Sequence, residues 1–413
     1  MSEYRIERMG AGGDGIAPGP LHISFTLPGE RVEALPAAKD RATLVEVLEA
    51  SAERVEAPCR HFTVCGGCAL QHWDEHPYAA WKRGRLAEAL SRAGYEDVEV
   101  APMVPTPRHV RQRADFGLER LADGRIEIGF HERGTTNLIP MRECHVVQPE
   151  LVALLPRLAD ALRGLNAIRR LGSALINMLD SGPDILLRTD MPLSMPDRRL
   201  LAAFAEAERL PRIGWGTKGG TEIAAQILPV RHNLSGVTVT PPPGAFLQAS
   251  VPGEAAIIEA VLAGLPKKRS PRARVADLFA GIGTLSFPLA KHVLVEAFEG
   301  DPAAAEALRA GANAAQMRIQ AERRDLARQP LLPAELKNYV AVVLDPPFAG
   351  APEQVAQIAR SKLERLIYVS CSPAALGRDA ATLRAAGFKI LQATPVDQFL
   401  WSPHLESVVV FAR

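Results

Sequence analysis

The sequence predicts an α/β protein whose C-terminal part is a doubly wound parallel sheet, preceded by a small β-barrel and a central α+β domain. Three observations lead to this fold class. From residue 254 onwards, apolar strands alternate with amphipathic helices, which is typical of a parallel sheet with helices on both faces. Short β-like runs separated by glycine and proline fill residues 4–55. Residues 56–240 mix helical and hairpin patterns.

The bulk properties indicate a folded protein of several domains. A chain of 413 residues exceeds the roughly 100–200 residues of one domain, and its hydrophobic (47%) and charged (23%) fractions are those of a globular protein. Lys plus Arg (48) nearly balance Asp plus Glu (47), so any nucleic-acid contact must be a local basic patch. The charged start and the absence of a long apolar run lead us to expect a cytoplasmic protein without a membrane partner.

The N-terminal region, residues 1–55, is predicted to be a small closed barrel. Its β-like runs are Ile23–Leu27, Arg31–Ala34 and Ala42–Val47, with glycine and proline turns between them. The run Gly10–Gly15 fits the pattern GxGxxG, yet no buried strand precedes it and a proline-containing loop follows where a nucleotide-binding helix should begin. We therefore interpret this run as a turn.

The central region, residues 56–240, opens with a cysteine-rich loop. The elements expected after it are a helix at Pro77–Ala93, hairpin strands at Arg111–Arg120 and Arg125–Glu132, and a helix at Glu150–Leu165. Gly124 supplies the hairpin turn. Three consecutive prolines and Gly244 predict a linker to the last domain, residues 241–413.

The last domain carries the pattern of the doubly wound sheet. A helix is expected at Glu254–Leu265. The expected strands are Val275–Phe279, Val293–Phe298, Ala341–Leu344, Leu366–Ser370 and Val408–Phe411. Because helices lie between the first four of these strands, those four should run parallel and place their carboxyl ends at one edge. Glu406, just before the final strand, should lie at the same edge.

A glycine-rich loop follows the first strand of this sheet. The residues Asp277-Leu278-Phe279-Ala280-Gly281-Ile282-Gly283-Thr284 lead into a helix, and their glycines let backbone approach a ligand. Glu299 ends the next strand, where a carboxylate can bind both ribose hydroxyls. The loop lacks the patterns that hold phosphates, so a nucleoside without pyrophosphate is favoured. A tight turn in another α/β fold is the alternative.

Reactive side chains follow two other strands. Asp345, in the run LDPPF, and Cys371, in the run VSCSP, should reach the same rim. A thiolate that adds to carbon 6 of uracil makes carbon 5 nucleophilic toward a methyl donor, and helix-start amides after Pro373 would lower the thiol pKa. Glu406, before the last strand, is the candidate base for the proton on carbon 5. Taken one at a time, Cys371 would more simply be interpreted as a buried free cysteine, and Glu406 as a solvated loop carboxylate.

The glycine loop and Glu299 resemble the first motif and the acidic second-strand end of class I S-adenosylmethionine-dependent methyltransferases, over roughly residues 270–413. The resemblance implies that S-adenosylmethionine is the cofactor. It further implies that Asp325, after the third strand, contacts the adenine; a solvated loop aspartate is the alternative. The cofactor-binding residues implied in the loop are Asp277, Phe279, Gly281, Gly283 and Thr284.

Asp345, Cys371 and Glu406 resemble, in this order, the DPP, SCNP-type and PHxE-type motifs of the RNA 5-methyluridine methyltransferases. The resemblance implies that Cys371 is the nucleophile and Glu406 the base. The run Phe246-Leu247-Gln248-Ala249-Ser250 is similar to the FxQxN segment of that family, which implies that Gln248, together with Asp345, helps to hold the cofactor.

Two positions depart from this family, which commonly carries Arg where the chain has Phe348 and Asn where it has Ser372. DPPF also resembles the (D/N)PP(F/Y) motif of amino-group methyltransferases, which are the alternative enzyme class, although Cys371 has no role in their chemistry. A non-catalytic RNA-binding or ribosome-assembly protein with a degenerate methyltransferase fold is the second alternative.

The four remaining cysteines are candidate metal ligands. Cys59, Cys65 and Cys68 share one loop and Cys144 is distant; four thiolates suit an iron–sulfur cluster or zinc, and the spacing does not choose between them. An odd total of five argues against a disulfide framework. The run from Cys59 to His72 resembles the [4Fe–4S] loop of the large-subunit ribosomal RNA branch of the family. The resemblance implies a [4Fe–4S] cluster with a structural or RNA-positioning role.

A stacked uracil cannot reach Cys371, so the target must be flipped out or lie in a loop. The N-terminal barrel is similar to a TRAM domain, an OB-like RNA-binding module. The resemblance to the ribosomal branch implies 23S rRNA as the partner in preference to tRNA, and we expect a monomer. Residues that could contact phosphates, or merely solvate the surface, are Lys82, Arg83, Arg85, Arg108, Arg111 and Arg113.

Overall fold

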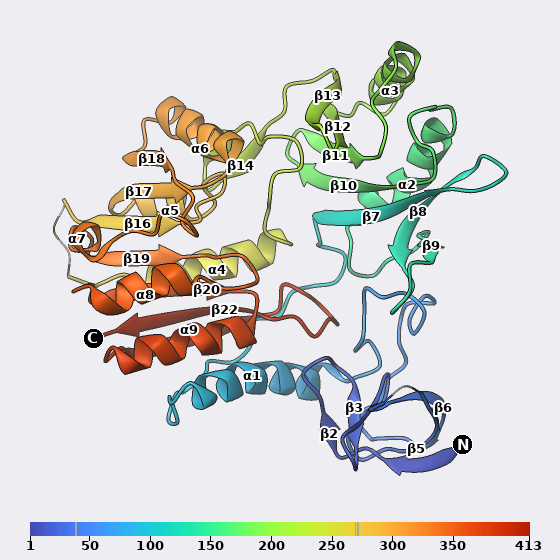
Figure 1. The fold of residues 1–413 in the computed structure, drawn as a ribbon, viewed down its shortest axis with the longest axis horizontal. Helices are drawn as coiled ribbons and strands as arrows, with labels where there is room; N and C mark the ends of the chain where they lie inside the picture. The colour runs from blue at the N-terminus through green and yellow to red at the C-terminus, as the bar shows by residue number, and fades with distance from the viewer. Residues whose placement is uncertain (38, 269, 271) are drawn as a thin grey trace.

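The computed structural model describes residues 1–37, 39–268, 270 and 272–413. Three large sheets and one two-stranded sheet organise these residues; the large ones are formed by the N-terminal strands, by the central region and by the C-terminal region (Figure 1). In the part of the chain so described, no helix combines the length and the apolar character needed to cross a membrane.

The N-terminal sheet contains β1 (Ser2–Arg5), β2 (Arg8–Met9), β3 (Gly15–Ala17), β4 (Leu21–Ile23), β5 (Arg31–Pro36) and β6 (Arg41–Glu49). Its strand order is β1-β5-β6-β4-β3-β2. Between β1 and β2, Ile6 N donates to Glu30 O and Glu7 N donates to Ile16 O, so the sheet curls back toward its own edge. The Gly10–Gly15 run connects β2 to β3, whose first residue is Gly15, and its turn confirms that this run is not a nucleotide-binding loop before a helix. The OB-like identity of this region stays a prediction.

The central sheet contains β7 (Arg113–Arg120), β8 (Ile126–His131), β9 (Leu138–Pro140), β10 (Leu171–Leu179), β11 (Gly182–Arg188), β12 (Arg212–Thr217) and β13 (Gly220–Gln226). Its order is β13-β12-β11-β10-β7-β8-β9. Helices α2 (Pro149–Arg163) and α3 (Met195–Ala207) contribute to its core. Leu151, Leu155, Leu158 and Leu162 of α2 recur at helical spacing and are buried, which explains why this helix packs on the sheet.

The C-terminal sheet contains β16 (Arg274–Leu278), β17 (Leu294–Glu299), β18 (Ile319–Arg323), β19 (Ala341–Leu344), β20 (Arg365–Ser370), β21 (Lys389–Val396) and β22 (Glu406–Ala412). Its order is β18-β17-β16-β19-β20-β22-β21. Neighbouring strands from β18 to β20 are parallel, as predicted, whereas β22 is antiparallel to both of its neighbours. Because β22 runs antiparallel, its start lies at the edge where the parallel strands end, and Glu406 therefore reaches that edge, the position that the sequence predicts for it.

Helices cover both faces of this sheet. They are α4 (Val251–Ala263), α5 (Ser286–Ala290), α6 (Pro302–Ala314), α7 (Pro333–Leu336), α8 (Pro352–Arg360) and α9 (Pro373–Ala385). Along β20, Leu366 and Tyr368 join one core cluster and Ile367 and Val369 join the other. This alternation buries the strand on both faces, as expected for parallel strands between two helix layers. A short hairpin, β14 (His232–Leu234) and β15 (Val237–Val239), precedes α4.

Helix α1 (Glu75–Arg92) belongs in sequence to the central region but packs beside α9 (Figure 1). Its Leu86 and Leu90 lie in the core of the C-terminal sheet. Lys82 is fully buried and forms an ion pair with Asp397, so its assignment to phosphate contact is wrong. The proposed boundaries after residues 55 and 240 stay predictions, and this helix ties the two larger parts together.

Candidate active site

A cavity of about 970 Å³ lies where the carboxyl ends of the parallel strands meet. The residues from the sequence prediction that line it are Gln248, Phe279, Gly281, Glu299, Asp345, Cys371 and Glu406. Asp277, Gly283, Thr284 and Asp325, which the structure also describes, do not line this cavity. The fold thus brings the two proposed reactive groups and much of the proposed cofactor site into one space.

The glycine loop owes its shape to unusual backbone angles. Gly283 has φ +104°, and a Cβ there would come within 2.5 Å of the Phe287 ring, so only glycine fits. Phe279 also has a positive φ of 62°, a strained conformation often found at functional sites. The Glu299 carboxylate accepts hydrogen bonds from Gly281 N at 2.8 Å and Asp301 N at 2.7 Å. These bonds hold the loop against the end of β17.

Two of the predicted acidic residues lie outside the cavity lining. Asp277 is completely buried below the glycine loop, accepts a hydrogen bond from Ser286 Oγ at 2.5 Å, and has a pKa that burial raises to about 7. It therefore joins β16 to α5. Asp325 is exposed after β18 and accepts a hydrogen bond from Ala327 N. The Asp325 backbone lies close to Gly300, which directly follows Glu299.

The floor of the cavity holds three acidic groups. In the β20–β22 pairing Ser370 lies opposite Ser407, so the next residues, Cys371 and Glu406, are neighbours at the sheet edge. Burial raises the pKa of Asp345 to about 7, and burial together with the Asp345 charge raises the pKa of Glu406. Like charges in one dry space oppose each other, so the floor does not favour full ionisation.

The pKa of Cys371 departs from the sequence prediction. Burial, followed by the charges of Glu406 and Asp345, raises it to about 12. The predicted lowering is wrong because desolvation and two carboxyl groups outweigh the backbone amides at the start of α9. The thiol is therefore protonated at neutral pH in the absence of ligands.

Gln398 organises the floor and was missed by the sequence reasoning. Its Nε2 donates to Gln248 Oε1 at 2.8 Å and to Glu406 Oε2 at 3.2 Å. Its Oε1 accepts a hydrogen bond from Ala249 N at 3.0 Å. Gln248 Nε2 in turn lies 3.5 Å from Asp345 Oδ2. Two side-chain amides, Gln398 and Gln248, thus connect the two carboxyl groups. Only the place of Gln398 two residues after β21 could have signalled this in the sequence.

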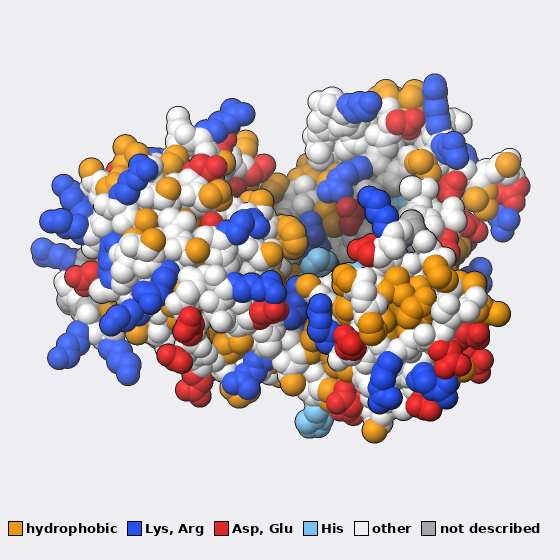
Figure 2. Space-filling view, turned by 60° about the horizontal axis from the view of Figure 1, so that its bottom comes forward, with side chains coloured by type: hydrophobic (Ala, Val, Ile, Leu, Met, Phe, Trp, Pro, Cys, Tyr) orange, Lys and Arg blue, Asp and Glu red, His pale blue; other side chains and the backbone are white. Residues whose placement is uncertain are grey.

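Two arginines belong to the lining of the cavity. Arg111 and Arg113 line it, and within the described residues neither forms an ion pair with a carboxylate. The Arg113 guanidinium lies 5.3 Å from the ring of Phe246, which is 63% exposed. Figure 2 shows a deep hollow between the lobes of the molecule with Lys and Arg side chains around it. Such unpaired cations are suited to phosphate oxygens.

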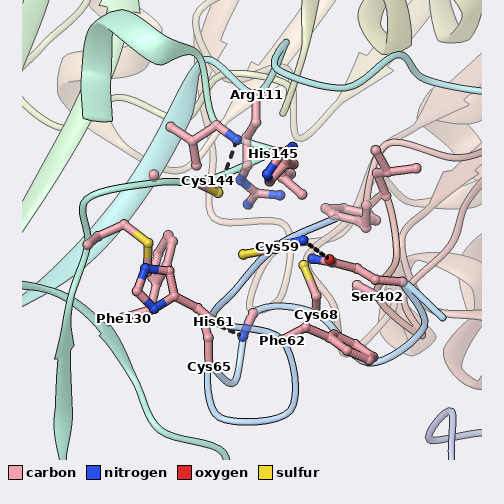
Figure 3. A pocket seen from close by; sticks show the side chains of 18 of the residues that line it. Cys59, His61, Phe62, Cys65, Cys68, Arg111, Phe130, Cys144, His145 and Ser402 are labelled. Atoms are coloured by element: carbon pink, nitrogen blue, oxygen red, sulfur yellow. Dashed lines mark hydrogen bonds between the residues drawn. The ribbon is translucent and has the colours of Figure 1, made fainter. Parts of the chain in front are cut away.

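A second cavity, of about 370 Å³, is lined by Cys59, Cys65, Cys68 and Cys144 (Figure 3). Gly67 N donates to the Cys65 sulfur and Val147 N to the Cys144 sulfur, both at 3.4 Å, as is common around thiolate ligands. Among the residues that the structure describes, no three ligating side chains are close enough together to hold one metal ion. The four thiols instead border a shared space.

The histidines near these cysteines divide into two groups. His61 and His145 line the cysteine cavity, and His145 is paired with Glu143 at 2.8 Å. His72 is buried against Phe25 and Phe62, away from the cavity lining, and burial lowers its pKa to about 3. His72 is therefore a neutral core residue.

The cysteine loop is joined to the active site by backbone hydrogen bonds. Ala69 N and Leu70 N both donate to Trp401 O, at 2.8 and 3.1 Å. Trp401 belongs to the loop between β21 and β22, which also carries Gln398 and ends at Glu406. On the other side, Tyr78 Oη accepts a hydrogen bond from Trp401 N at 2.9 Å. The two cavities therefore share one supporting loop.

Comparisons with known proteins agree with this geometry. The family described as tRNA (uracil-5-)-methyltransferase matches residues 272–413. A protein of Brucella suis described as an uncharacterized RNA methyltransferase is 42% identical, over 100% of this chain and 98% of its own length. The 23S rRNA (uracil(1939)-C(5))-methyltransferase RlmD of Halomonas elongata is 33% identical, over 94% of this chain and 84% of its own.

A solved structure shares the fold. It is that of the tRNA (uracil-54, C5)-methyltransferase of Pyrococcus abyssi in complex with S-adenosyl-L-homocysteine, with a TM-score of 0.78, 21% identity and 99% coverage of both chains. Strand order, glycine loop and this likeness together define a class I, S-adenosylmethionine-dependent methyltransferase. The chain belongs to the RNA uracil-5-methyltransferase family, as its identity to full-length relatives shows.

Proposed function

We propose that this enzyme methylates carbon 5 of a uridine in 23S rRNA, working as a monomer through a covalent bond between Cys371 and the base. The observation that carries the proposal is the placement of Cys371, Glu406 and Asp345 around the floor of one buried cavity. The name of the Halomonas relative supports 23S rRNA as the substrate. The Pyrococcus enzyme acts on tRNA, but its 21% identity carries less weight for the choice of RNA.

The cofactor is assigned to the part of the cavity next to the glycine loop. Phe279, Gly281 and Glu299 line this part and would bind the nucleoside, and Gln248 and Asp345 lie toward the floor. Asp277, Gly283 and Thr284 shape the loop from behind, and Asp325 is our proposed adenine contact at its outer edge. Bound S-adenosylmethionine would supply an electrophilic methyl group and one positive charge to this acidic cavity.

In the first half of the reaction, the Cys371 thiol gives its proton to water and the thiolate adds to carbon 6 of uracil. The electron pair of the carbon 5–carbon 6 double bond moves to carbon 5, which would take the methyl group as its bond to sulfur breaks, with S-adenosylhomocysteine as the leaving group. The raised pKa of Cys371 makes thiolate formation a costly part of this half. The step therefore depends on ligands that offset the two neighbouring carboxyl groups.

In the second half, Glu406 removes the proton from carbon 5. The released electron pair restores the double bond between carbons 5 and 6 and expels Cys371 as thiolate. Gln398 holds the Glu406 carboxyl by a hydrogen bond of 3.2 Å, and this contact fixes the direction of the base. The product is 5-methyluridine within the RNA chain.

The first test is mass spectrometry of nucleosides from rRNA and tRNA of cells with and without the gene. Loss of 5-methyluridine from one large-subunit rRNA fragment is the expected result, with recovery on complementation by the wild-type gene but not by Cys371→Ala. Loss from tRNA alone would overturn the choice of RNA. Binding of RNA without methyl transfer by purified, cofactor-loaded protein would overturn the catalytic proposal and leave an assembly role.

A second candidate function is methylation of an amino group in RNA or DNA. Phe348 favours it, because this exposed ring completes a DPPF motif at the cavity mouth. The same nucleoside analysis separates the two functions. Disappearance of a methylated adenine, rather than of 5-methyluridine, would support this candidate.

We further propose that Cys59, Cys65, Cys68 and Cys144 bind a [4Fe–4S] cluster. Thiols spread around a cavity suit a cluster in which each iron takes its own cysteine, whereas zinc needs four ligands converging on one ion. Anaerobic iron and sulfide analysis of purified protein should find four of each per chain. Stoichiometric zinc without iron would refute the cluster.

The N-terminal region is assigned to RNA binding as a TRAM-like module. A truncation that removes residues 1–55 should weaken RNA binding and leave cofactor binding unchanged. This outcome would be measured by anisotropy with labelled rRNA fragments and by calorimetry with S-adenosylhomocysteine. Unchanged RNA affinity would refute the assignment.

A further inference from the structure

Three aromatic side chains form a row between the two cavities. The ring centroids of Phe399 and His404 are 6.0 Å apart, and those of His404 and Phe348 are 5.9 Å apart, both in edge-to-face geometry. The Arg111 guanidinium lies 5.9 Å from the Phe399 ring at the other end. Phe348 lines the active-site cavity, His404 lines the cysteine cavity, and Phe399 lines both. We call Phe399, His404 and Phe348 the aromatic row.

Phe348 is the exposed end of this row. Its side chain is 60% exposed, although it follows the buried strand β19 by only a few residues. The preceding prolines, Pro346 and Pro347, restrict the backbone, and Gly350 N donates to Pro347 O at 2.8 Å to close the turn. The ring is therefore held on a stiff turn. A pre-organised ring loses little conformational entropy when a flat ligand stacks on it.

The aromatic row suits an uncharged, flat ligand at its Phe348 end. Burial, and the nearby positive charges of Lys82, Arg85 and Arg111, lower the pKa of His404 and so disfavour the charged imidazole. The Arg111 guanidinium lies over the Phe399 ring, at the end of the row opposite to Phe348. A phosphate is therefore better placed near Arg111, and a nucleobase near Phe348. Stacking on aromatic rings is the usual way in which proteins hold unpaired bases.

We propose that the aromatic row binds the base of a nucleotide adjacent to the target uridine, in a single-stranded part of the RNA. This inference rests on the proposed function, because it takes the base that reacts to lie at Cys371. Cys371 and Glu406 belong to the floor of the cavity, whereas Phe348 stands exposed at its mouth. The target base occupies the floor of the cavity, so the Phe348 ring at the mouth would contact the base of a neighbouring nucleotide.

Binding of RNA fragments with single abasic positions tests the proposal. Fluorescence anisotropy would compare wild-type protein, Phe348→Ala and Phe348→Tyr on intact RNA and on RNAs lacking the base at the target or at either neighbour. We expect Phe348→Ala to weaken binding of intact RNA about tenfold and Phe348→Tyr to keep it. Removing one neighbouring base should lower the RNA affinity of the wild-type protein by a similar factor. The same removal should not lower the RNA affinity of Phe348→Ala any further. Leu391→Ala, a change at a comparably exposed residue (57%) of β21, is the control.

Two results would overturn the proposal. Equal affinity of Phe348→Ala and wild-type protein for intact RNA would remove Phe348 from the RNA contact. If removal of the target base, instead of a neighbouring base, were the change that has no further effect on binding by Phe348→Ala, the ring would hold the reacting nucleotide itself. Methyl transfer to carbon 5 is measured in parallel on intact RNA. Coupling to a neighbour without methyl transfer would leave the stacking platform valid while refuting the proposed function.

Discussion

Replacing Glu406 by Gln separates the two halves of the proposed covalent reaction. The amide has the same shape as the carboxylate and can still accept the hydrogen bond from Gln398, 3.2 Å away. The cavity floor therefore keeps its packing. Cys371 is unchanged, so addition to carbon 6 and methyl transfer still proceed. Only the acceptor for the proton on carbon 5 is lost.

The expected effect on turnover is large. A positioned general base contributes about 10²–10⁴-fold to a rate, so kcat of Glu406→Gln should fall by that factor. Because the thiolate cannot be expelled, a methylated protein–RNA adduct should accumulate. Rapid mixing of protein, cofactor and labelled RNA, followed by denaturing electrophoresis, measures the adduct and the product in one experiment.

The pH profile provides a second measurement. Burial and the Asp345 charge raise the pKa of Glu406, and burial and two carboxyl groups raise that of Cys371. Both groups must lose a proton to act, so wild-type turnover should rise with pH through two ionisations. Glu406→Gln should keep only the rise that belongs to Cys371. The slope of log kcat against pH should therefore decrease.

A matched control is available at Glu254. Burial raises its pKa to about 7, as in the active site, but it lies in the first turn of α4 and does not line the active-site cavity. Glu254→Gln should leave turnover unchanged, and Cys371→Ala added to Glu406→Gln should abolish the adduct. Wild-type turnover in Glu406→Gln, or lost turnover without an adduct, would refute the role of Glu406 as base.

Three further predictions concern supporting residues. Gln398→Ala removes the donor shared by Gln248 and Glu406 and should lower kcat about tenfold, measured by steady-state kinetics, with an unchanged rate as the contrary result. Asp277 has a pKa raised from 3.8 to about 7, so its contribution to stability is complete below about pH 4 and is lost as pH rises through 7. In urea denaturation, the free energy of unfolding of Asp277→Asn should therefore vary less between about pH 4 and pH 7 than that of the wild-type protein, by on the order of 4 kcal/mol. The same pH dependence in both proteins would contradict this. Cys144→Ser should lower bound iron, measured anaerobically, and unchanged iron would remove Cys144 from the ligand set.

The sequence by itself determined the elements of the C-terminal sheet and the order of its motifs. Strand Ala341–Leu344 was predicted with the bounds that the structure gives it. The glycine loop and Glu299 were placed correctly at the ends of two strands. These features are local: a strand buried on both faces is a short apolar run, and a positive φ needs glycine. The roles of the individual site residues stay predictions.

The tertiary structure alone decided how these pieces meet. The antiparallel insertion of β22 makes Glu406 a neighbour of Cys371. Tyr78 of α1 forms a hydrogen bond with Asp397, 319 positions further along the chain. Gln398 reaches Gln248 across 150 positions of the chain. The raised pKa of Cys371 likewise comes from burial and from carboxyl groups on other strands. No local pattern encodes such contacts, because burial and charge at the cavity floor depend on residues that only the folded chain brings together.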